Sequence, residues 1–414
     1  MHAKTKITAV ALAAMTLTMA VTAFFLLQDD GERYGEGMMI DFGDHTGDWI
    51  PTGSYGRDGR SVIEDACAEK GYAVAFDGDA VVSVDGVPAS GGRTWDLWIW
   101  MSGSGWNKTT SPASVTLSDD VFASLALTYA GQEPLIPCVD ATGKSVFGST
   151  SGNIVSLSAV ATEILCKTGN IDSLAAVDYY SNYPAEVVER GLVKEWGFYL
   201  TPPTAEIVAG YNPDLVVGEV NNHDDLLNAL RSSGIRCISL YQADTLEAVY
   251  RNIWLIGAAT GHTDEAGATI RMMKEHLEDL LSDPLIAGLE GKTAAILMGN
   301  EWYVMAIGRG TFVDDIISRT GIVNAFGDQG WIMNTEYITT KVPDIVIFIA
   351  DEDLGDADIK ALINSKLPAW PDPGTDPWGR AALYYVDVSY GDMLLRAGPR
   401  VIQALEALIN TEPM

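Results

Sequence analysis

The sequence predicts two doubly wound α/β lobes joined by a long helix, after a small α+β domain and an N-terminal transmembrane segment. From residue 153 onward, short apolar strands alternate with amphipathic helices, and this alternation occurs on both sides of one long helical pattern. Before residue 139, short strands are separated by frequent Gly and Asp turns around a single helix, which is typical of an α+β module. A length of 414 residues fits several domains of roughly 150 residues each.

The composition excludes several classes of protein. Apolar residues make up 47% of the chain, which is enough to build buried cores. Lys and Arg total 26 against 56 Asp and Glu, so the formal net charge is −30. Nucleic-acid binding and peripheral docking on anionic lipid both need clustered cations, so the charge balance argues strongly against the first and also against the second.

The N-terminus reads as a membrane-targeting segment. Lys4 and Lys6 precede an uncharged run over residues 7–27, which is long enough to cross a bilayer as a helix. Asp29 and Asp30 follow, and positive charge before the run places everything after it outside the cytoplasm. Residues 1–30 are predicted to be a retained signal anchor, with a cleaved signal peptide as the alternative.

Four cysteines are spaced without any zinc-binding pattern. Outside the cell, Cys67–Cys138 and Cys166–Cys237 would place each disulfide within one predicted unit. Buried free thiols are an equally good interpretation.

The small domain is predicted over residues 33–138. We expect strands at 38–42, 80–84, 95–101 and 122–129, and a helix at 61–71 that Ser61 caps. The segment 84–87 (VDGV) and the Trp-rich strand after it resemble a small domain of archaeal and bacterial surface proteins, related in shape to the C-terminal domain of transcobalamin. We interpret the Trp cluster as core.

A linker at 139–152, rich in Gly, Ser and Thr, leads to the first lobe at 153–244. This lobe is predicted to have strands at 154–158, 174–178, 214–219 and 236–240, and helices at 159–168, 205–211 and 224–231. One connecting helix is expected over 245–285; Gly257 and Gly261 interrupt its pattern, so two segments are the alternative. The second lobe, 286–414, is predicted to have strands at 293–298, 345–349 and 383–388, and helices at 312–320, 358–363 and 399–409.

In this arrangement the carboxyl ends of the strands of both lobes point toward the gap between them, where α/β proteins bind ligands. Several motifs lie in the same order as in one known family. They are 154–158 (IVSLS), 161–164 (ATEI), 178–184 (DYYSNYP), 206–208 (EIV), 212–216 (NPDLV), 310–315 (GTFVDD) and 343–346 (PDIV). The chain thus resembles the substrate-binding proteins of vitamin B12, haem and iron–siderophore ABC importers. The loop ending in Tyr183-Pro184 and the segment 392–400 (DMLLRAGPR) are most similar to the cobalamin-binding member.

The resemblance implies a corrinoid held between the lobes as a transported ligand, with no catalytic cofactor. It implies that Tyr180 and Trp196 face the ligand from the first lobe, and that Trp331, Asp392 and Arg396 face it from the second. The stretch between Trp196 and Glu206 is longer than in the cobalamin-binding member, so Phe198 or Tyr199 is the alternative to Trp196. In the second lobe, Trp302 and Tyr303 are the other aromatic candidates.

A corrinoid has large apolar faces and amide groups at its rim, so its site needs aromatic walls and a few polar groups. The aromatic candidates, Tyr179 and Tyr390 among them, are expected in loops rather than in strand interiors, which favours a ligand site over ordinary packing. Asp392 and Arg396 are four residues apart, a spacing that also fits a plain salt bridge on a helix.

Glu206 and Glu336 each start a helix that precedes a Pro-Asp strand. In the family, one carboxylate per lobe docks on arginines of the membrane permease, so the resemblance implies this role for both. The alternative is a favourable charge at a helix N-terminus.

No metal site, phosphate-binding loop or nucleophile–base motif is visible, so we do not expect an enzyme. His223 is interpreted as a loop or cap residue rather than a ligand of a bound metal. The predicted partners are an ABC permease and its ATPase. A haem or ferric-siderophore binder of the same class is the first alternative, and a surface protein that kept the fold without transport is the second.

Overall fold

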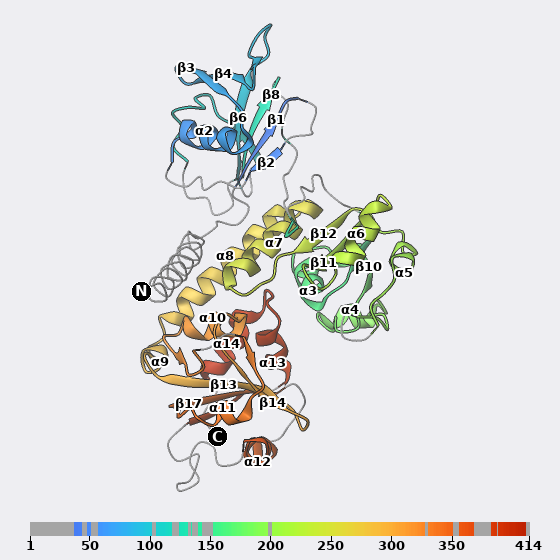
Figure 1. Cartoon of the computed structure of the whole chain (residues 1–414). Helices are drawn as coiled ribbons and strands as arrows, with labels where there is room; N and C mark the ends of the chain where they lie inside the picture. The colour runs from blue at the N-terminus through green and yellow to red at the C-terminus, as the bar shows by residue number, and fades with distance from the viewer. Residues whose placement is uncertain are drawn as a thin grey trace, which may run out of the picture.

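The computed structural model describes residues 37–43, 48–50, 57–101, 105–117, 124–130, 134, 140–142, 152–197, 201–327, 330–350, 356–367, 382–386 and 388–410. The expected anchor over 7–27 lies outside these residues. Within them, no helix is both long enough and apolar enough to cross a membrane. The described residues build three sheets with their helices, a mixed α/β architecture (Figure 1).

The first sheet has the order β2-β1-β8-β6-β4-β3, in which β1 and β8 are parallel. Helix α2 (Gly59–Lys70) covers one face, and its Val62, Ile63 and Ala66 are buried in one cluster with Trp95 and Leu97. The strands are β1 (Gly37–Asp41), β2 (Asp48–Ile50), β3 (Val74–Asp77), β4 (Ala80–Val84), β5 (Val87–Pro88), β6 (Trp95–Met101), β7 (Gly105–Lys108) and β8 (Ser124–Tyr129).

Local side chains set the ends of two elements in this unit. Helix α2 begins earlier than predicted because Asp58, not Ser61, is its cap: the Asp58 carboxylate accepts the Ser61 N–H at 2.9 Å and the Ser61 hydroxyl at 2.8 Å. The same bonds lower the pKa of Asp58. Between β4 and β5, Asp85 and Gly86 have φ of 46° and 77°, which closes a two-residue hairpin turn. The expectation that Trp95 is a core residue is confirmed.

Lobe 1, residues 152–240, has the sheet order β10-β9-β11-β12 with every pair parallel. Its strands are buried on both faces, which explains their nearly continuous apolar sequences. The elements are β9 (Ile154–Ser156), α3 (Ala159–Lys167), β10 (Leu174–Val177), α4 (Ala185–Glu189), α5 (Ala205–Ala209), β11 (Leu215–Glu219), α6 (Asp224–Ser232) and β12 (Cys237–Leu240).

The prediction of one connecting helix over 245–285 is wrong, and the two-segment alternative is correct. Helix α7 (Leu246–Thr260) ends at Gly261, whose φ of 78° is left-handed, and α8 (Thr263–Leu281) follows, then the short α9 (Pro284–Ala287). The two long helices pack antiparallel: a Cβ at Gly257 would lie 2.4 Å from that of Ala266, and the Lys274 ammonium lies 5.2 Å from the Tyr250 ring centroid. Only a residue without a side chain fits at position 257.

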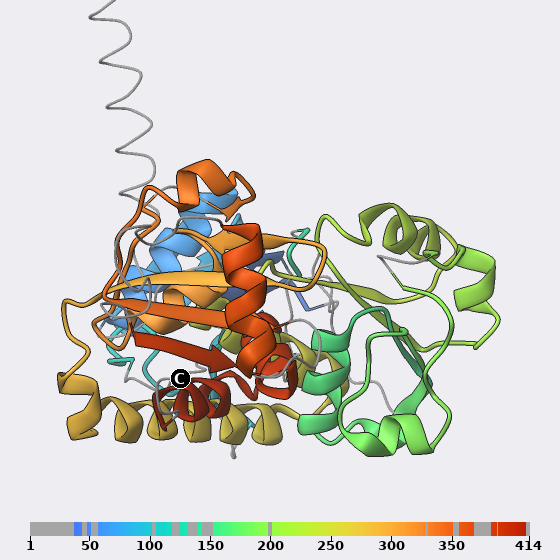
Figure 2. The same cartoon turned by 90° about the horizontal axis from the view of Figure 1, so that it is seen from below.

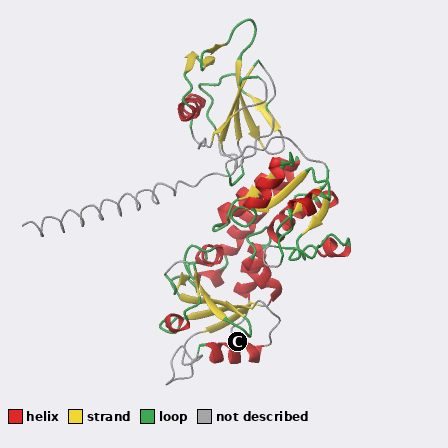
Figure 3. Cartoon of the chain, turned by 45° about the vertical axis from the view of Figure 1, so that its right-hand side comes forward, coloured by secondary structure: helices red, strands yellow, loops and turns green. Residues whose placement is uncertain are grey.

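Lobe 2, residues 293–410, has the sheet order β16-β14-β13-β17-β18, with β15 also beside β13. Figure 3 shows this sheet in yellow with red helices around it. Strands β14 and β16 were not predicted; they add an antiparallel extension to one edge. The predicted strand over 383–388 is too long, because Val388 already begins helix α13. The elements are β13 (Thr293–Gly299), β14 (Val304–Ile307), α10 (Phe312–Ser318), β15 (Val323–Asn324), β16 (Trp331–Ile332), α11 (Thr335–Ile338), β17 (Ile345–Ala350), α12 (Asp356–Lys366), β18 (Ala382–Val386), α13 (Val388–Leu395) and α14 (Val401–Asn410).

The Pro-Asp motif performs the same task in both lobes. Asp214, just before β11, accepts the backbone N–H of Asn153 at 3.0 Å, and Asp344, just before β17, accepts that of Thr293 at 2.9 Å. In each case the carboxylate fixes the start of a central strand against its neighbour. The Thr293 N–H and hydroxyl also lower the pKa of Asp344.

Cys67 and Cys166 are free thiols, so neither of the two disulfides considered is formed and the alternative of free thiols holds for these two; Cys138 lies outside the described residues. Burial raises the pKa of Cys67 to about 11 and that of Cys166 to about 12. These thiols therefore stay protonated and unreactive at neutral pH.

Candidate functional site

Two carboxylates stand at the carboxyl edge of the lobe 1 sheet, and we call Asp178 and Glu219 the acidic edge. Asp178 directly follows β10 and Glu219 ends β11, so they flank the end of the central strand β9. Asp178 is only 3% exposed and accepts hydrogen bonds from the Ser181 hydroxyl at 2.5 Å and the Tyr180 N–H at 3.3 Å. These hydrogen bonds fix the Asp178 carboxyl group at the end of β10.

Burial raises the pKa of both acidic-edge carboxyls. The negative charge of Asp178 raises that of Glu219 further, while hydrogen bonds from the side chains of Asn222 and Ser158 oppose the shift. A chain of hydroxyls lies beneath them: the Thr162 hydroxyl is 2.8 Å from that of Ser156 and 2.7 Å from that of Ser181.

His223 is a structural residue, as expected. Its imidazole is 6% exposed, and Nδ1 accepts the backbone N–H of Glu219 at 3.1 Å. Burial lowers its pKa, so the ring is neutral with its proton on Nε2.

The predicted aromatic residues of lobe 1 separate into exposed and buried ones. Tyr179 is 53% exposed and meets Tyr180 edge to face, with ring centroids 5.4 Å apart. Trp196, by contrast, is 8% exposed and belongs to the cluster of Ala176 and Val208, so its indole is part of the lobe core. Phe198 and Tyr199 lie outside the described residues.

The predicted aromatic residues of lobe 2 lie in three different places: the turn after β13, the edge strand β16 and helix α13. Trp302 is 78% exposed in the turn after β13, where the Asn300 side chain accepts its N–H at 2.8 Å, and Tyr303 follows in the same turn. Trp331 is not in a loop: it lies on the edge strand β16 opposite Ile307 and is 53% exposed. Tyr390 lies in helix α13, not in a loop, and its side chain is outside the described part.

Asp392 and Arg396 form the salt bridge that their spacing allows, at 2.8 Å, but Arg396 also reaches lobe 1. Its guanidinium donates to the Asn182 side chain at 2.7 Å and to Glu163 at 3.3 Å, and Arg400 donates to Glu163 at 2.9 Å. Arg400 further lies 3.6 Å from the ring centroid of Tyr183. We call Glu163, Asn182, Arg396 and Arg400 the interlobe clamp.

The sequence reasoning missed Glu163, Arg400 and the acidic edge. A signal was present for Glu163, since it is the one acidic residue in the mostly apolar helix α3; the structure buries it to 4% exposure. For the acidic edge, the signal was a carboxylate at the carboxyl end of two predicted strands.

Glu206 and Glu336 occupy equivalent positions in the two lobes. Each is exposed and is the second residue of a short helix, α5 and α11, whose cap (Thr204 or Asn334) accepts the N–H three residues on. Hydrogen bonding to its own backbone N–H and to Thr204 lowers the pKa of Glu206. Each helix precedes the Pro-Asp motif of its lobe.

Two α/β lobes of the same plan, joined by helices and clamped by charges, define a two-lobed solute-binding protein. Residues 154–370, just over half of the chain, match the family described as periplasmic binding protein, and the chain belongs to this family. This confirms the resemblance to substrate-binding proteins of ABC transporters.

The chain is 27% identical to an uncharacterized ABC transporter substrate-binding lipoprotein of Bacillus subtilis over 62% of this chain and 79% of that protein. It is 22% identical to a cobalamin-binding protein of Halobacterium salinarum over 62% of this chain and 68% of that one. A periplasmic heme binding protein from Pseudomonas aeruginosa has the same fold, with a TM-score of 0.51 and 23% identity over 63% of this chain and 94% of that one.

We expect Glu163→Gln to lower the free energy of unfolding by about 3 kcal/mol, because it leaves two half-buried guanidinium groups without their shared carboxylate. Urea denaturation of the full chain measures this loss. The control is Glu186→Gln, which breaks an exposed ion pair with Arg190 and should cost less than about 0.5 kcal/mol. Equal losses in the two variants would show that the clamp does not hold the lobes.

Proposed function

We propose that this protein captures a corrinoid between its two lobes, outside the cytoplasm, and delivers it to an ABC permease and its ATPase. The acidic edge is the observation that carries the choice of ligand. Corrinoids carry amide groups at their rim, which hydrogen-bond to a carboxyl group and most strongly to a charged one, whereas the carboxylates of haem are repelled by any negative charge that Asp178 and Glu219 keep despite their raised pKa values. The formal net charge of −30 also disfavours a negatively charged ligand such as haem.

The exposed aromatic side chains support a flat ligand with apolar faces. Tyr179 follows β10 of lobe 1 and is 53% exposed. Trp302 follows β13 of lobe 2 and is 78% exposed. A ligand that covers an exposed aromatic side chain removes apolar surface from water, which stabilises the complex. Tyr180, Tyr303 and Trp331 are the other expected contacts that fit this role. Asp392 fits a different one, because its carboxylate pairs with Arg396 and can still accept a hydrogen bond from an amide at the rim of the ligand.

The relationship to the Halobacterium protein named as cobalamin-binding supports the same ligand. We place the protein outside the cytoplasm on the strength of the family and the apolar run over 7–27, which we propose as its membrane anchor. The role is capture and delivery without chemistry on the ligand. Closure of the lobes is expected to be small, because the clamp already joins them.

Haem is the second candidate, and the exposed phenol of Tyr179 is the observation that favours it, since tyrosine is a ligand of ferric iron. His223 offers no such ligand, because the ring is buried and its Nδ1 is already bonded to the backbone.

Calorimetric titration of the full chain with cyanocobalamin, haemin and a ferric hydroxamate siderophore tests the ligand. We expect one-to-one binding of cobalamin, and we expect Trp302→Ala to weaken it about tenfold, a loss of about 1.4 kcal/mol. Met272→Ala, at an exposed apolar residue of α8, should leave it unchanged. Binding of haemin alone would replace the corrinoid, and no heat with any of the three would favour a protein without a transport role.

The acidic edge makes the affinity for cobalamin depend on pH. The pKa values of Asp178 and Glu219 lie above the ordinary 3.8 and 4.5, so the carboxylates protonate, and lose acceptor strength, as the pH falls toward those raised values. We expect the affinity to fall several-fold as the pH is lowered from 7.5, with the fall centred above the ordinary pKa of a carboxyl group.

Glu219→Gln should bind weakly at pH 7.5 and show a smaller pH dependence, whereas Glu278→Gln on α8 should behave as the wild type. A wild-type affinity that rises as the pH falls would contradict the role of the acidic edge.

Docking on a permease is tested by reversing one charge in each lobe. We expect Glu206→Arg combined with Glu336→Arg to reduce ligand-stimulated ATPase activity of the reconstituted importer at least tenfold, because like charges would face the arginines of the permease. Cobalamin affinity should stay unchanged. Glu275→Arg, exposed on α8, is the control. Full stimulation by the double variant would leave both carboxylates with only the role of a favourable charge at a helix N-terminus.

A further inference from the structure

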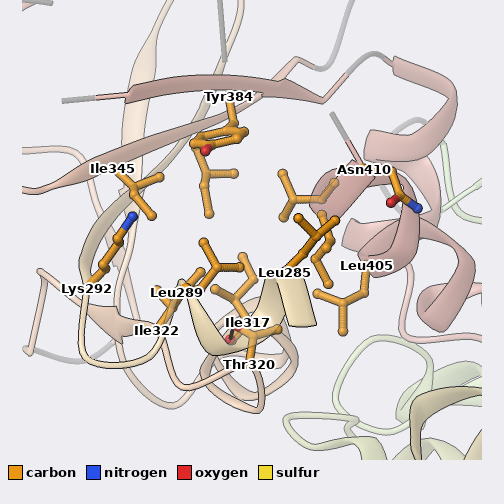
Figure 4. Close-up of a pocket in the computed structure, with 14 residues that line it drawn as sticks. Leu285, Leu289, Lys292, Ile317, Thr320, Ile322, Ile345, Tyr384, Leu405 and Asn410 are labelled. Carbon is orange, nitrogen blue, oxygen red and sulfur yellow. Dashed lines mark hydrogen bonds between the residues drawn. The ribbon is translucent and has the colours of Figure 1, made fainter. Parts of the chain in front are cut away.

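Lobe 2 contains a cavity of about 420 Å³ at the edge of its sheet away from the aromatic turn, and we call it the rear cavity (Figure 4). Lys292, which lines it, immediately precedes β13, whereas Trp302 follows the other end of that strand. A strand of seven residues spans roughly 20 Å, so the rear cavity is separate from the proposed solute site.

The walls of the rear cavity come from lobe 2 and from the segment 284–292 that leads into it. Strands β17 and β18 form one side, α9 and α14 form two more, and the end of α10 closes the bottom. Ile345 and Ile347 alternate along β17, so both side chains point to this face, and Tyr384 lies beside Ile347 in the sheet. The aliphatic lining is Leu285, Leu289, Ile317, Ile322, Ile345, Ile347, Leu405, Leu408 and Ile409.

The polar groups lie at the rim, apart from the buried Thr320, whose hydroxyl donates to the backbone carbonyl of Ile317 at 2.7 Å. Figure 4 shows the Lys292 ammonium at one end of the cavity, Asn410 at the other, and the ring of Tyr384 above the aliphatic side chains. Lys292 is exposed, and its charge lowers the pKa of the nearby Asp344. Leu285 is 58% exposed at the mouth, so an apolar surface continues from the interior to solvent.

The volume and chemistry together select a ligand class. A volume of about 420 Å³ falls in the range of small-molecule pockets, roughly 300–1,000 Å³, and is far larger than the voids of a packed core. Aliphatic walls do not hold ordered water, and their exposed area favours an apolar guest. A cation at one end adds a place for a negative head group.

We propose that the rear cavity binds a single-chain amphiphile: an aliphatic chain among the leucine and isoleucine side chains, with an anionic head group at Lys292. The chain and the head group could come from a free fatty acid or from a membrane lipid, and the chemistry of recognition is the same. This site does not depend on the identity of the solute bound between the lobes.

Titration of the full chain with dodecanoate, dodecanol and dodecyltrimethylammonium tests the proposal. Dodecanoate should bind at one site and more tightly than the other two, because only its head group pairs with Lys292. Leu289→Trp, at a half-buried lining residue, should fill the cavity and weaken dodecanoate binding at least tenfold. Binding that survives this substitution, or no binding of any of the three and no vesicle binding, would overturn the proposal.

Two further variants test the head group. Lys292→Gln should weaken dodecanoate about fivefold and leave dodecanol unchanged, while Lys360→Gln on α12 of the same lobe should change neither. Equal effects of the two substitutions on dodecanoate would overturn the role of Lys292.

Flotation with vesicles of anionic and of neutral phospholipid separates the two sources. Vesicle binding that Leu289→Trp abolishes, without binding of monomeric dodecanoate, would identify a membrane lipid as the occupant. Cyanocobalamin should not compete with dodecanoate, and competition would overturn the assignment of a separate site.

Discussion

The buried carboxylate of Glu163 is the contact on which the relative placement of the two lobes depends. It lies on α3 of lobe 1 and receives the guanidinium groups of Arg396 and Arg400 from lobe 2. At 4% exposure such a carboxylate is tolerated only because both cations neutralise it, so the lobes cannot separate without exposing all three charges. The position of Tyr179 relative to Trp302, and with it the width of the proposed ligand site, follows from this contact.

The helical hairpin of α7 and α8 provides a second constraint. Because α7 returns along α8, the connection between the lobes is two helices thick, and a flexible hinge would have to break the close packing at Gly257. Helix α8 begins near α3 of lobe 1 and runs beside α14 of lobe 2 (Figure 2). A connection of this kind favours capture by small rocking motions over wide opening and closing.

Charge and apolar surface are distributed unequally between the lobes. Lobe 1 concentrates its buried acids and hydroxyls at the carboxyl edge of its sheet, where a ligand with donor groups would be held. Lobe 2 carries the more exposed tryptophans and, behind its sheet, the aliphatic rear cavity. The two lobes repeat one plan, down to the aspartates that start β11 and β17, yet they offer different chemistry on that plan.

The sequence by itself determined the two α/β lobes, their main strands and the family, because apolar strands and amphipathic helices are encoded by local patterns that survive without an alignment. It also indicated that Glu206 and Glu336 occupy equivalent positions in the two lobes, since each belongs to a helix that precedes a Pro-Asp strand. The break at Gly261 was one of two alternatives that the sequence left open. The sequence did not determine the edge strand β16, the burial of Trp196 or the clamp at Glu163. These depend on contacts between segments far apart in the chain, more than 200 residues in the case of Glu163 and Arg400, and no local pattern records such a distance.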